Sequence, residues 1–278
     1  MAEQHTPRSL IVSLYGAYGR PSEGTPMPVA ALIRLLAAVG VDAPSVRSSV
    51  SRLKRRGLLL PRRTPDGAAG YALSDDARRL LEDGDRRIYA RTEPSLADGW
   101  VLAVFSVPEQ ERHKRHLLRS RLGRLGFGTA APGVWIAPAR LYEETRHALE
   151  RLGLSAYVDF FRGEHLGYTV TAEAVARWWD LPAIARLHEE FLAGQEPVLA
   201  AWREAPGTDG DAYRAYLLAL DSWRRLPYAD PVLPAELLPA RWPGRRSAEV
   251  FAELHELLWE RGAEHVRAVE KDLTGGPA

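Results

Sequence analysis

The sequence APSVRSSVSRLKRRGLLLPRR, residues 43–63, decides the fold of the first part of the chain. It opens with a proline in its first turn, a position that helices favour. Val46, Val50 and Leu53 follow at intervals of four and three residues, which places them on one face of a helix. The pattern predicts a helix that packs through this apolar face and turns its other side outward.

The outward side of this helix carries serines and arginines, because successive residues are rotated by about 100°. Serine allows close approach to DNA, and arginine can bond guanine with two parallel hydrogen bonds in the major groove. After Gly57, residues 58–63 and 69–73 predict a β-hairpin around a turn at residues 64–67. We therefore predict that DNA is contacted by Ser45, Arg47, Ser48, Ser51, Arg52, Lys54, Arg55, Arg56, Arg62 and Arg63.

Two further helices are predicted before this stretch. The first begins at Thr6-Pro7 and ends near Gly19, and the second begins at Pro28 and ends at Gly40. Three helices followed by a hairpin are the order of a winged helix-turn-helix DNA-binding domain. The alternative is a solvated, arginine-rich helix of a protein-interaction domain, which predicts no DNA affinity even at low salt.

Charge is unevenly distributed along the chain. Residues 1–73 hold ten basic and four acidic side chains, a net charge of +6, whereas the whole chain of 278 residues is +1. Residues 74–278 therefore carry a net charge of −5. A basic segment of this kind can neutralise several phosphates and release their counterions, which favours double-stranded DNA as its partner.

The composition is that of a folded protein with two or three domains. Hydrophobic residues make up 46% of the chain and charged residues 26%. The sequence has no cysteine, which excludes disulfides, thiolate zinc sites and cysteine nucleophiles. Residues 1–8 lack a signal-peptide pattern and no apolar run reaches the roughly 18–20 residues that span a bilayer, so we expect a cytoplasmic protein without membrane contact.

The middle of the chain predicts a ferredoxin-like domain. Its elements alternate as strand, helix, strand, strand, helix and strand, the βαββαβ order of an antiparallel sheet with both helices on one face. Beyond residue 172 the chain is mainly helical, with an extended, ordered or semi-ordered, proline-rich loop at residues 226–244. We therefore predict an α+β multidomain protein with a winged helix-turn-helix domain and its connecting helix at 1–92, the ferredoxin-like domain at 93–172 and a helical C-terminal domain at 173–278. The predicted elements of the middle domain are residues 100–107, 109–125, 127–131, 134–137, 141–152 and 155–162.

Motifs with catalytic or metal-binding spacing are weak in this sequence. Ser51 and Lys54 match a Ser-x-x-Lys spacing, but they lack the partner motifs of the acyl-enzyme hydrolases. His113 and His116 have no fixed third ligand, and His255 and His265 form no His-Glu-x-x-His motif. We predict no catalytic site, no cofactor and no metal.

The C-terminal part of the chain is rich in tryptophan and arginine. Each tryptophan alone is best explained as core, but a ligand that joins an aromatic group to phosphates would use both residue types. We name as candidate ligand-binding residues Arg177, Trp178, Trp179, Trp202, Trp223, Arg224, Arg225, Trp242, Arg245 and Arg246.

Nearly the whole chain resembles the PaaX family of regulators of phenylacetic acid catabolism. The likeness is carried by SLIV at residues 9–12, by SVRSSVSRLKRRGL at 45–58, and by LPYADPVLPAELLP at 226–239 leading into WPG at 242–244. The resemblance implies a winged helix-turn-helix, a ferredoxin-like middle domain and a helical C-terminal domain. It also implies repression of a phenylacetate operon, relieved by an aryl acyl-CoA such as phenylacetyl-CoA. The usual two-fold geometry of helix-turn-helix repressors on their operators predicts a homodimer, and we expect no enzymatic activity.

The middle domain also looks like the small ferredoxin-like subunits of CRISPR spacer acquisition, some of which are metal-dependent nucleases. Those subunits place an aspartate at the end of their first strand, where this chain has Phe105-Ser106-Val107. A nucleic-acid-processing protein with a nuclease-related, inactive domain is therefore the alternative function.

Overall fold

The computed structural model describes residues 5–19, 26–89 and 94–274, in two compact units. Unit 1 comprises Met1–Tyr89, Phe191–Arg224 and Ala248–Ala278, and unit 2 comprises Ala90–Glu190 and Arg225–Ser247. None of the helices in the described residues combines the length and the apolar character needed to cross a membrane. The predicted boundaries at residues 92 and 172 stay predictions, because the units are built from interleaved segments.

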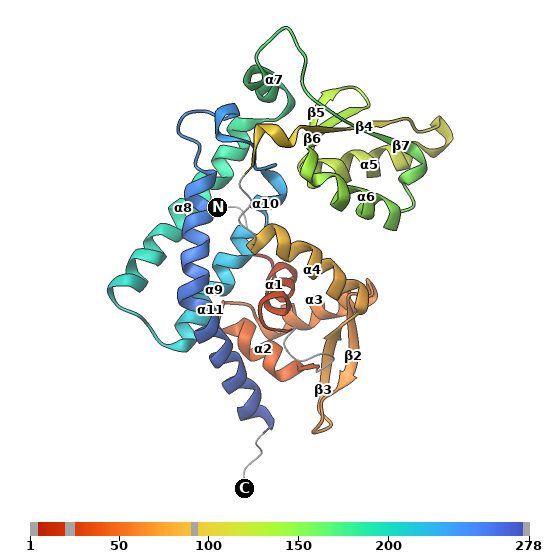
Figure 1. The fold of residues 1–278 in the computed structure, drawn as a ribbon. Helices are drawn as coiled ribbons and strands as arrows, with labels where there is room; N and C mark the ends of the chain where they lie inside the picture. The colour runs from red at the N-terminus through yellow and green to blue at the C-terminus, as the bar shows by residue number, and fades with distance from the viewer. Residues whose placement is uncertain (1–4, 20–25, 90–93, 275–278) are drawn as a thin grey trace. The chain divides into compact units, whose positions relative to one another are not determined.

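Unit 1 begins with three helices and a hairpin, in the predicted order (Figure 1). Side-chain caps start two of the helices: Thr6 Oγ1 accepts a hydrogen bond from the backbone N–H of Ser9, and the Asp42 carboxylate accepts one from that of Ser45. The elements are α1 (Pro7–Tyr18), α2 (Val29–Ala37), α3 (Ala43–Arg55), β2 (Leu59–Arg63), β3 (Ala69–Leu73) and α4 (Asp75–Tyr89).

The hairpin is part of a three-stranded sheet of order β1-β3-β2. Sequence patterns missed β1 (Met27–Pro28), which pairs with β3, because a two-residue strand has no periodicity. Pro28, predicted to open the second helix, therefore belongs to this strand, and α2 begins one residue later. At the tip, the Gly67 N–H donates to the Thr64 carbonyl, and Gly67 takes a φ of +86°, which few residues other than glycine adopt.

The C-terminal helices of unit 1 share one aromatic core with its N-terminal helices. Trp223 stacks on Phe251 with ring centroids 5.0 Å apart, and Trp223 Nε1 donates to the Ile88 carbonyl of α4. Tyr18 of α1 contacts the ring of Tyr213. The helices involved are α9 (Asp209–Trp223), α11 (Gly244–Thr274) and the second part of α8 (Leu181–Glu204).

Unit 2 contains a four-stranded antiparallel sheet of order β5-β6-β4-β7. This order and the βαββαβ sequence of elements are those of the predicted ferredoxin-like arrangement. The predicted ends at residues 100, 131 and 134 are confirmed, and the other ends were wrong by one to three residues, chiefly where 3₁₀ turns precede the helices and the last strand. The elements are β4 (Trp100–Phe105), α5 (Arg112–Arg124), β5 (Gly128–Ala131), β6 (Val134–Pro138), α6 (Tyr142–Arg151) and β7 (Val158–Gly163).

Both faces of this sheet are covered, by different parts of the chain. Figure 1 shows α5 and α6 together on one face, where Val101, Ala103 and Ala137 pack against their leucines. On the other face, Trp100 and Ile136 pack against α7 (Thr171–Trp178), the start of α8 and the segment around η5 (Ala235–Leu237). The predicted proline-rich loop is thus ordered and includes α10 (Leu226–Ala229). The segment around η5, which follows β6 by more than 90 residues in sequence, therefore completes the core of unit 2.

At Gly128, strand β5 packs closely against Trp178 and Trp179 in the core on the second face of the sheet. A Cβ atom at this position would lie 2.6 Å from the Trp178 carbonyl oxygen and 2.7 Å from a ring carbon of Trp179. We predict that Gly128→Ala destabilises unit 2 by about 1–3 kcal/mol, as overpacking usually does, and lowers its thermal midpoint by several degrees in calorimetry.

Gly194→Ala is the matched control. Gly194 lies inside α8, and a methyl group added to it would meet no described atom within 4 Å. Alanine there should raise stability by up to about 1 kcal/mol through helix propensity. Equal thermal midpoints for Gly128→Ala and the unsubstituted protein would contradict the packing described here.

Candidate nucleic-acid interface

Helix α3 separates its apolar and basic sides as the sequence predicts. Val46, Val50 and Leu53 are buried and hold the helix against the rest of unit 1, where α1 and α2 pack on it. The exposed side carries seven of the predicted DNA-binding residues, namely Arg47, Ser48, Ser51, Arg52, Lys54, Arg55 and Arg56.

Ser45 is the one predicted DNA-binding residue of α3 that is not exposed. It is half-buried, and its hydroxyl donates to the Asp42 carboxylate at 2.8 Å, so it closes the N-terminal cap of the helix. Burial of Ser49 was not predicted, although it lies on the same side as the apolar stripe; its hydroxyl accepts a hydrogen bond from Arg52 at 3.0 Å. That bond orients the Arg52 side chain along the helix.

The hairpin extends the basic surface beyond α3. Arg62 and Arg63 are exposed at the end of β2. The Arg63 guanidinium donates to the Gly67 carbonyl at 2.6 Å, so it is held at the tip of the hairpin. Arg62 lies one residue earlier on the same strand and faces solvent.

None of the seven basic side chains of residues 47–63 has a carboxylate within 4 Å among the described residues. Some other arginines of the chain are paired. Arg146 pairs with Glu143 and Glu150, and Arg267 pairs with two glutamates on α11. Since Arg119 and Arg124 on α5 also have no carboxylate partner among the described residues, the feature that favours an external anionic partner for α3 is the concentration of seven basic and no acidic side chains in residues 43–63.

Arg8 adds to this surface and was not named in the sequence prediction. Partial burial lowers the pKa of its guanidinium, and nearby positive charges lower it further. Those charges belong to Arg56, Arg224 and Arg52. The proximity of the start of α1 to α3 could not be read from sequence, because the two segments are more than forty residues apart.

A buried carboxylate fixes the start of α1 beside α9. Asp221 is fully buried and accepts hydrogen bonds from the hydroxyls of Ser9, at 2.5 Å, and Ser13, at 2.8 Å. His5 Nδ1 lies 2.9 Å from the same carboxylate, and Arg224 Nε lies 3.2 Å from it. Burial alone would raise the pKa of Asp221, but these hydrogen bonds and the Arg224 charge outweigh it, so the pKa is lowered.

Three of the ten candidate ligand-binding residues belong to unit 1, where each has a structural partner. Trp223 is buried in the aromatic core, and Arg224 bonds Asp221 and Ser9. Trp202 is half-buried under the Arg261 guanidinium, 5.5 Å from the ring centroid. These contacts explain all three side chains without a ligand.

The other seven candidates belong to unit 2. Trp178, Trp179 and Trp242 surround the second core of the sheet, and Trp179 Nε1 donates to the Gly126 carbonyl at 3.0 Å. Four arginines of this group are exposed: Arg177, Arg225, Arg245 and Arg246. Trp178 is the candidate that also lines a pocket, together with Trp100, Leu102 and His165, which the sequence prediction did not name.

The described residues contain no group of three or more His, Asp or Glu side chains placed to hold a metal ion. His113 and His116, considered as a pair from their spacing, are both exposed on α5.

Three family models match successive parts of the chain. A PaaX-like protein model matches residues 6–77, the PaaX protein central Cas2-like domain matches residues 93–175, and a PaaX-like protein C-terminal domain matches residues 179–268. The chain belongs to the PaaX family. The resemblance noted from three sequence stretches is thereby confirmed.

Two relatives of this PaaX family member add to the picture. The transcriptional repressor PaaX of Escherichia coli (strain K12) is 26% identical over 253 residues, which cover 89% of this chain and 79% of that protein. An uncharacterized protein of Mycobacterium tuberculosis has a similar structure, with a TM-score of 0.62 and 23% identity, covering 94% of this chain and 99% of that one. The second likeness shows the fold alone.

The lowered pKa of Asp221 predicts acid sensitivity of unit 1. Because its pKa is lower in the folded than in the unfolded state, its stabilisation is present above about pH 4 and is lost as the pH falls through the folded pKa. We predict that Asp221→Asn lowers the free energy of unfolding of unit 1 by roughly 3 kcal/mol at pH 7 and by less at acid pH, measured by denaturant titration.

Asp209→Asn serves as the control, because this carboxylate is exposed and pairs with Arg261 at the surface. It should change stability by less than about 1 kcal/mol. If Asp221→Asn lowered the free energy of unfolding by the same amount at pH 7 and at acid pH, the stabilising role assigned to the ionised carboxylate would be contradicted.

Proposed function

We propose that this protein is a DNA-binding transcription repressor whose first 92 residues form a winged helix-turn-helix domain and its connecting helix. The observation that carries this proposal is the outward face of α3, where exposed arginines and serines have no acidic partner among the described residues. In this role α3 lies in the major groove, and Arg62 and Arg63 of the hairpin reach the adjacent backbone. The repressor title of the Escherichia coli relative supports the same function.

The protein acts as a homodimer in this proposal. Two copies of α3, related by a two-fold axis, read half-sites in successive major grooves of a near-palindromic operator. Arg47, Arg52 and Arg55 are the residues long enough to reach guanine edges, while Ser48 and Ser51 permit close approach. Arg8 and Lys54 bind backbone phosphates at the edge of the interface.

The effector proposed is an aryl acyl-CoA, such as phenylacetyl-CoA, that releases the protein from the operator of a phenylacetate operon. Release requires that the ligand bind the DNA-incompetent state more tightly than the competent one, because equal affinity shifts no population. The protein needs no catalytic residue for this task, so we propose a regulator and not an enzyme.

Arg52→Ala combined with Arg55→Ala is expected to lower operator affinity by at least tenfold at about 0.1 M salt. Loss of two charges on the groove-facing side also reduces the slope of log affinity against log salt by about two, since each phosphate contact contributes about 0.9. Fluorescence anisotropy on operator DNA across a salt series measures both quantities.

The matched control is Arg119→Ala with Arg124→Ala, which removes the same charge from exposed positions on α5 of unit 2. This control should change the operator affinity by less than twofold and the salt slope by less than half a unit. Equal behaviour of the two double variants would show that α3 does not contact DNA.

Phenylacetyl-CoA is expected to lower operator affinity at least tenfold, which corresponds to a coupling free energy of about 1.4 kcal/mol. The reciprocal measurement must agree: saturating operator DNA should weaken phenylacetyl-CoA binding by the same factor in titration calorimetry. Unchanged operator binding at saturating phenylacetyl-CoA would remove this effector and leave the DNA-binding proposal in place.

A further inference from the structure

We propose that the aryl group of the effector is bound in a pocket on the second face of the unit 2 sheet, between β4 and the loop at residues 164–167. This inference rests on the proposed function and assigns a place to its ligand. The pocket has a volume of about 320 Å³. Its lining comprises Trp100, Leu102, Ala130, Ile136, Glu164, His165, Leu166, Gly167 and Trp178.

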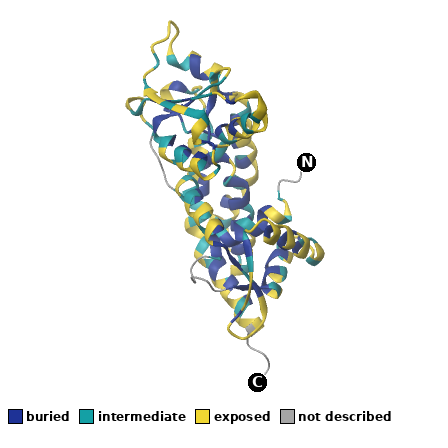
Figure 2. Ribbon diagram, turned by 90° about the vertical axis from the view of Figure 1, so that its right-hand side faces the viewer, coloured by how far each residue is buried: buried dark blue, intermediate teal, exposed yellow. Residues whose placement is uncertain are grey.

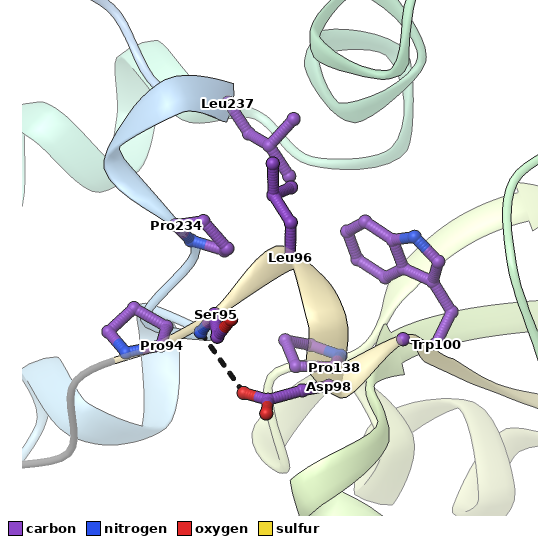
Figure 3. Close-up of a pocket in the computed structure, with 9 residues that line it drawn as sticks. Pro94, Ser95, Leu96, Asp98, Trp100, Pro138, Pro234 and Leu237 are labelled. Carbon is purple, nitrogen blue, oxygen red and sulfur yellow. Dashed lines mark hydrogen bonds between the residues drawn. The ribbon is translucent and has the colours of Figure 1, made fainter.

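The size of the pocket suits one aromatic ring with a short arm. Small-molecule sites measure about 300–1,000 Å³, and an apolar cavity of about 150 Å³ already holds benzene. Another crevice of this unit lies between η1 (Leu96–Asp98) and η5 and has a volume of about 10 Å³. In that crevice Leu96 and Leu237 point toward each other (Figure 3), so it has no room for a ligand.

The walls of the pocket are mostly apolar and aromatic. Its floor is the sheet, with Trp100 and Leu102 from β4 and Ile136 from β6. The Trp178 ring stands edge-on to Trp100, with centroids 5.5 Å apart, and edge-on to His165, at 5.1 Å. Such edges and faces are the surfaces on which another aromatic ring packs favourably.

Apolar surface near this pocket is left uncovered. Phe161, which pairs with Leu102 across the sheet, is 58% exposed although it lies on the same face. In the loop that leads to α7, Leu166 is 92% exposed. Figure 2 shows the loop between β7 and α7 as largely exposed. An apolar ligand would bury part of this surface, and an uncovered apolar patch of this kind often marks a binding site.

Two polar side chains, Glu164 and His165, also line the pocket. His165 Nδ1 lies 3.3 Å from Thr171 Oγ1, and no described residue hydrogen-bonds to His165 Nε2. When Nδ1 accepts the threonine hydroxyl, Nε2 carries the proton and donates to a carbonyl. A ring held by apolar walls with a donor at the rim fits an aryl acyl group, and the remainder of the thioester extends to solvent.

Calorimetric titration of the full-length protein tests this assignment, with phenylacetyl-CoA, phenylacetate and CoA as separate probes. Ala130→Phe fills the pocket from β5 and is expected to raise the dissociation constant for phenylacetyl-CoA at least tenfold. Ala131→Phe adds the same group at the next, exposed position of the strand, which does not line the pocket, and should change it less than twofold.

A second pair of variants substitutes histidines in an exposed loop and on an exposed helix surface, where alanine should not impair folding. His165→Ala removes the donor from an exposed loop and is expected to weaken phenylacetyl-CoA binding three- to tenfold, while His113→Ala, exposed on α5, is the control. Thermal melting reports whether Ala130→Phe folds; if it does not, the His165 pair decides.

Three results would overturn the assignment: equal affinity of Ala130→Phe and Ala131→Phe for phenylacetyl-CoA, equal affinity of the two histidine variants, or no binding of phenylacetyl-CoA and phenylacetate to the unsubstituted protein. Operator affinity is measured in parallel without any ligand. Failure there contradicts the proposed DNA-binding function. Equal affinities within a variant pair contradict the pocket alone, whereas no binding of phenylacetyl-CoA also removes the proposed effector and leaves the DNA-binding proposal in place.

Discussion

The buried carboxylate of Asp221 is the interaction on which the arrangement of unit 1 depends. It holds the start of α1 through two serine hydroxyls, and α1 in turn packs against α3 and α9. Since α3 buries Val46, Val50 and Leu53 against these neighbours, its remaining side can carry only polar and basic groups. A single desolvated charge, compensated by hydroxyls and an arginine, thus helps to hold in place the helix α1 against which the apolar side of α3 packs.

Local patterns predicted much of this structure because they depend on few residues. The start of α1 at Thr6-Pro7, the apolar stripe of α3 and the βαββαβ order were all predicted from spacing. Pairing between distant segments was not predicted. The pairing of β1, the proximity of Arg8 to the basic surface and the Asp221 cluster each join segments separated by forty to more than two hundred residues, and no periodicity encodes them.

The tryptophans illustrate the same limit at the candidate ligand site. Their number suggested an aromatic site, but sequence could not distinguish Trp223, which stacks in a core, from Trp178, which lines a pocket. The difference arises from the second face of the sheet. That face is covered by α7 and the segment around η5, and this cover leaves Leu102 half-buried and Phe161 exposed.

The aromatic core of unit 1 has a consequence for how the N-terminal segment folds. Tyr18 packs against Tyr213 of α9, and the carbonyl of Ile88 accepts a hydrogen bond from Trp223, so the N-terminal segment cannot be cut free without uncovering large apolar rings. A fragment that ended after α4 would leave this hydrophobic side bare in water. The three helices and the hairpin are therefore part of a larger folding unit and not a module that folds by itself.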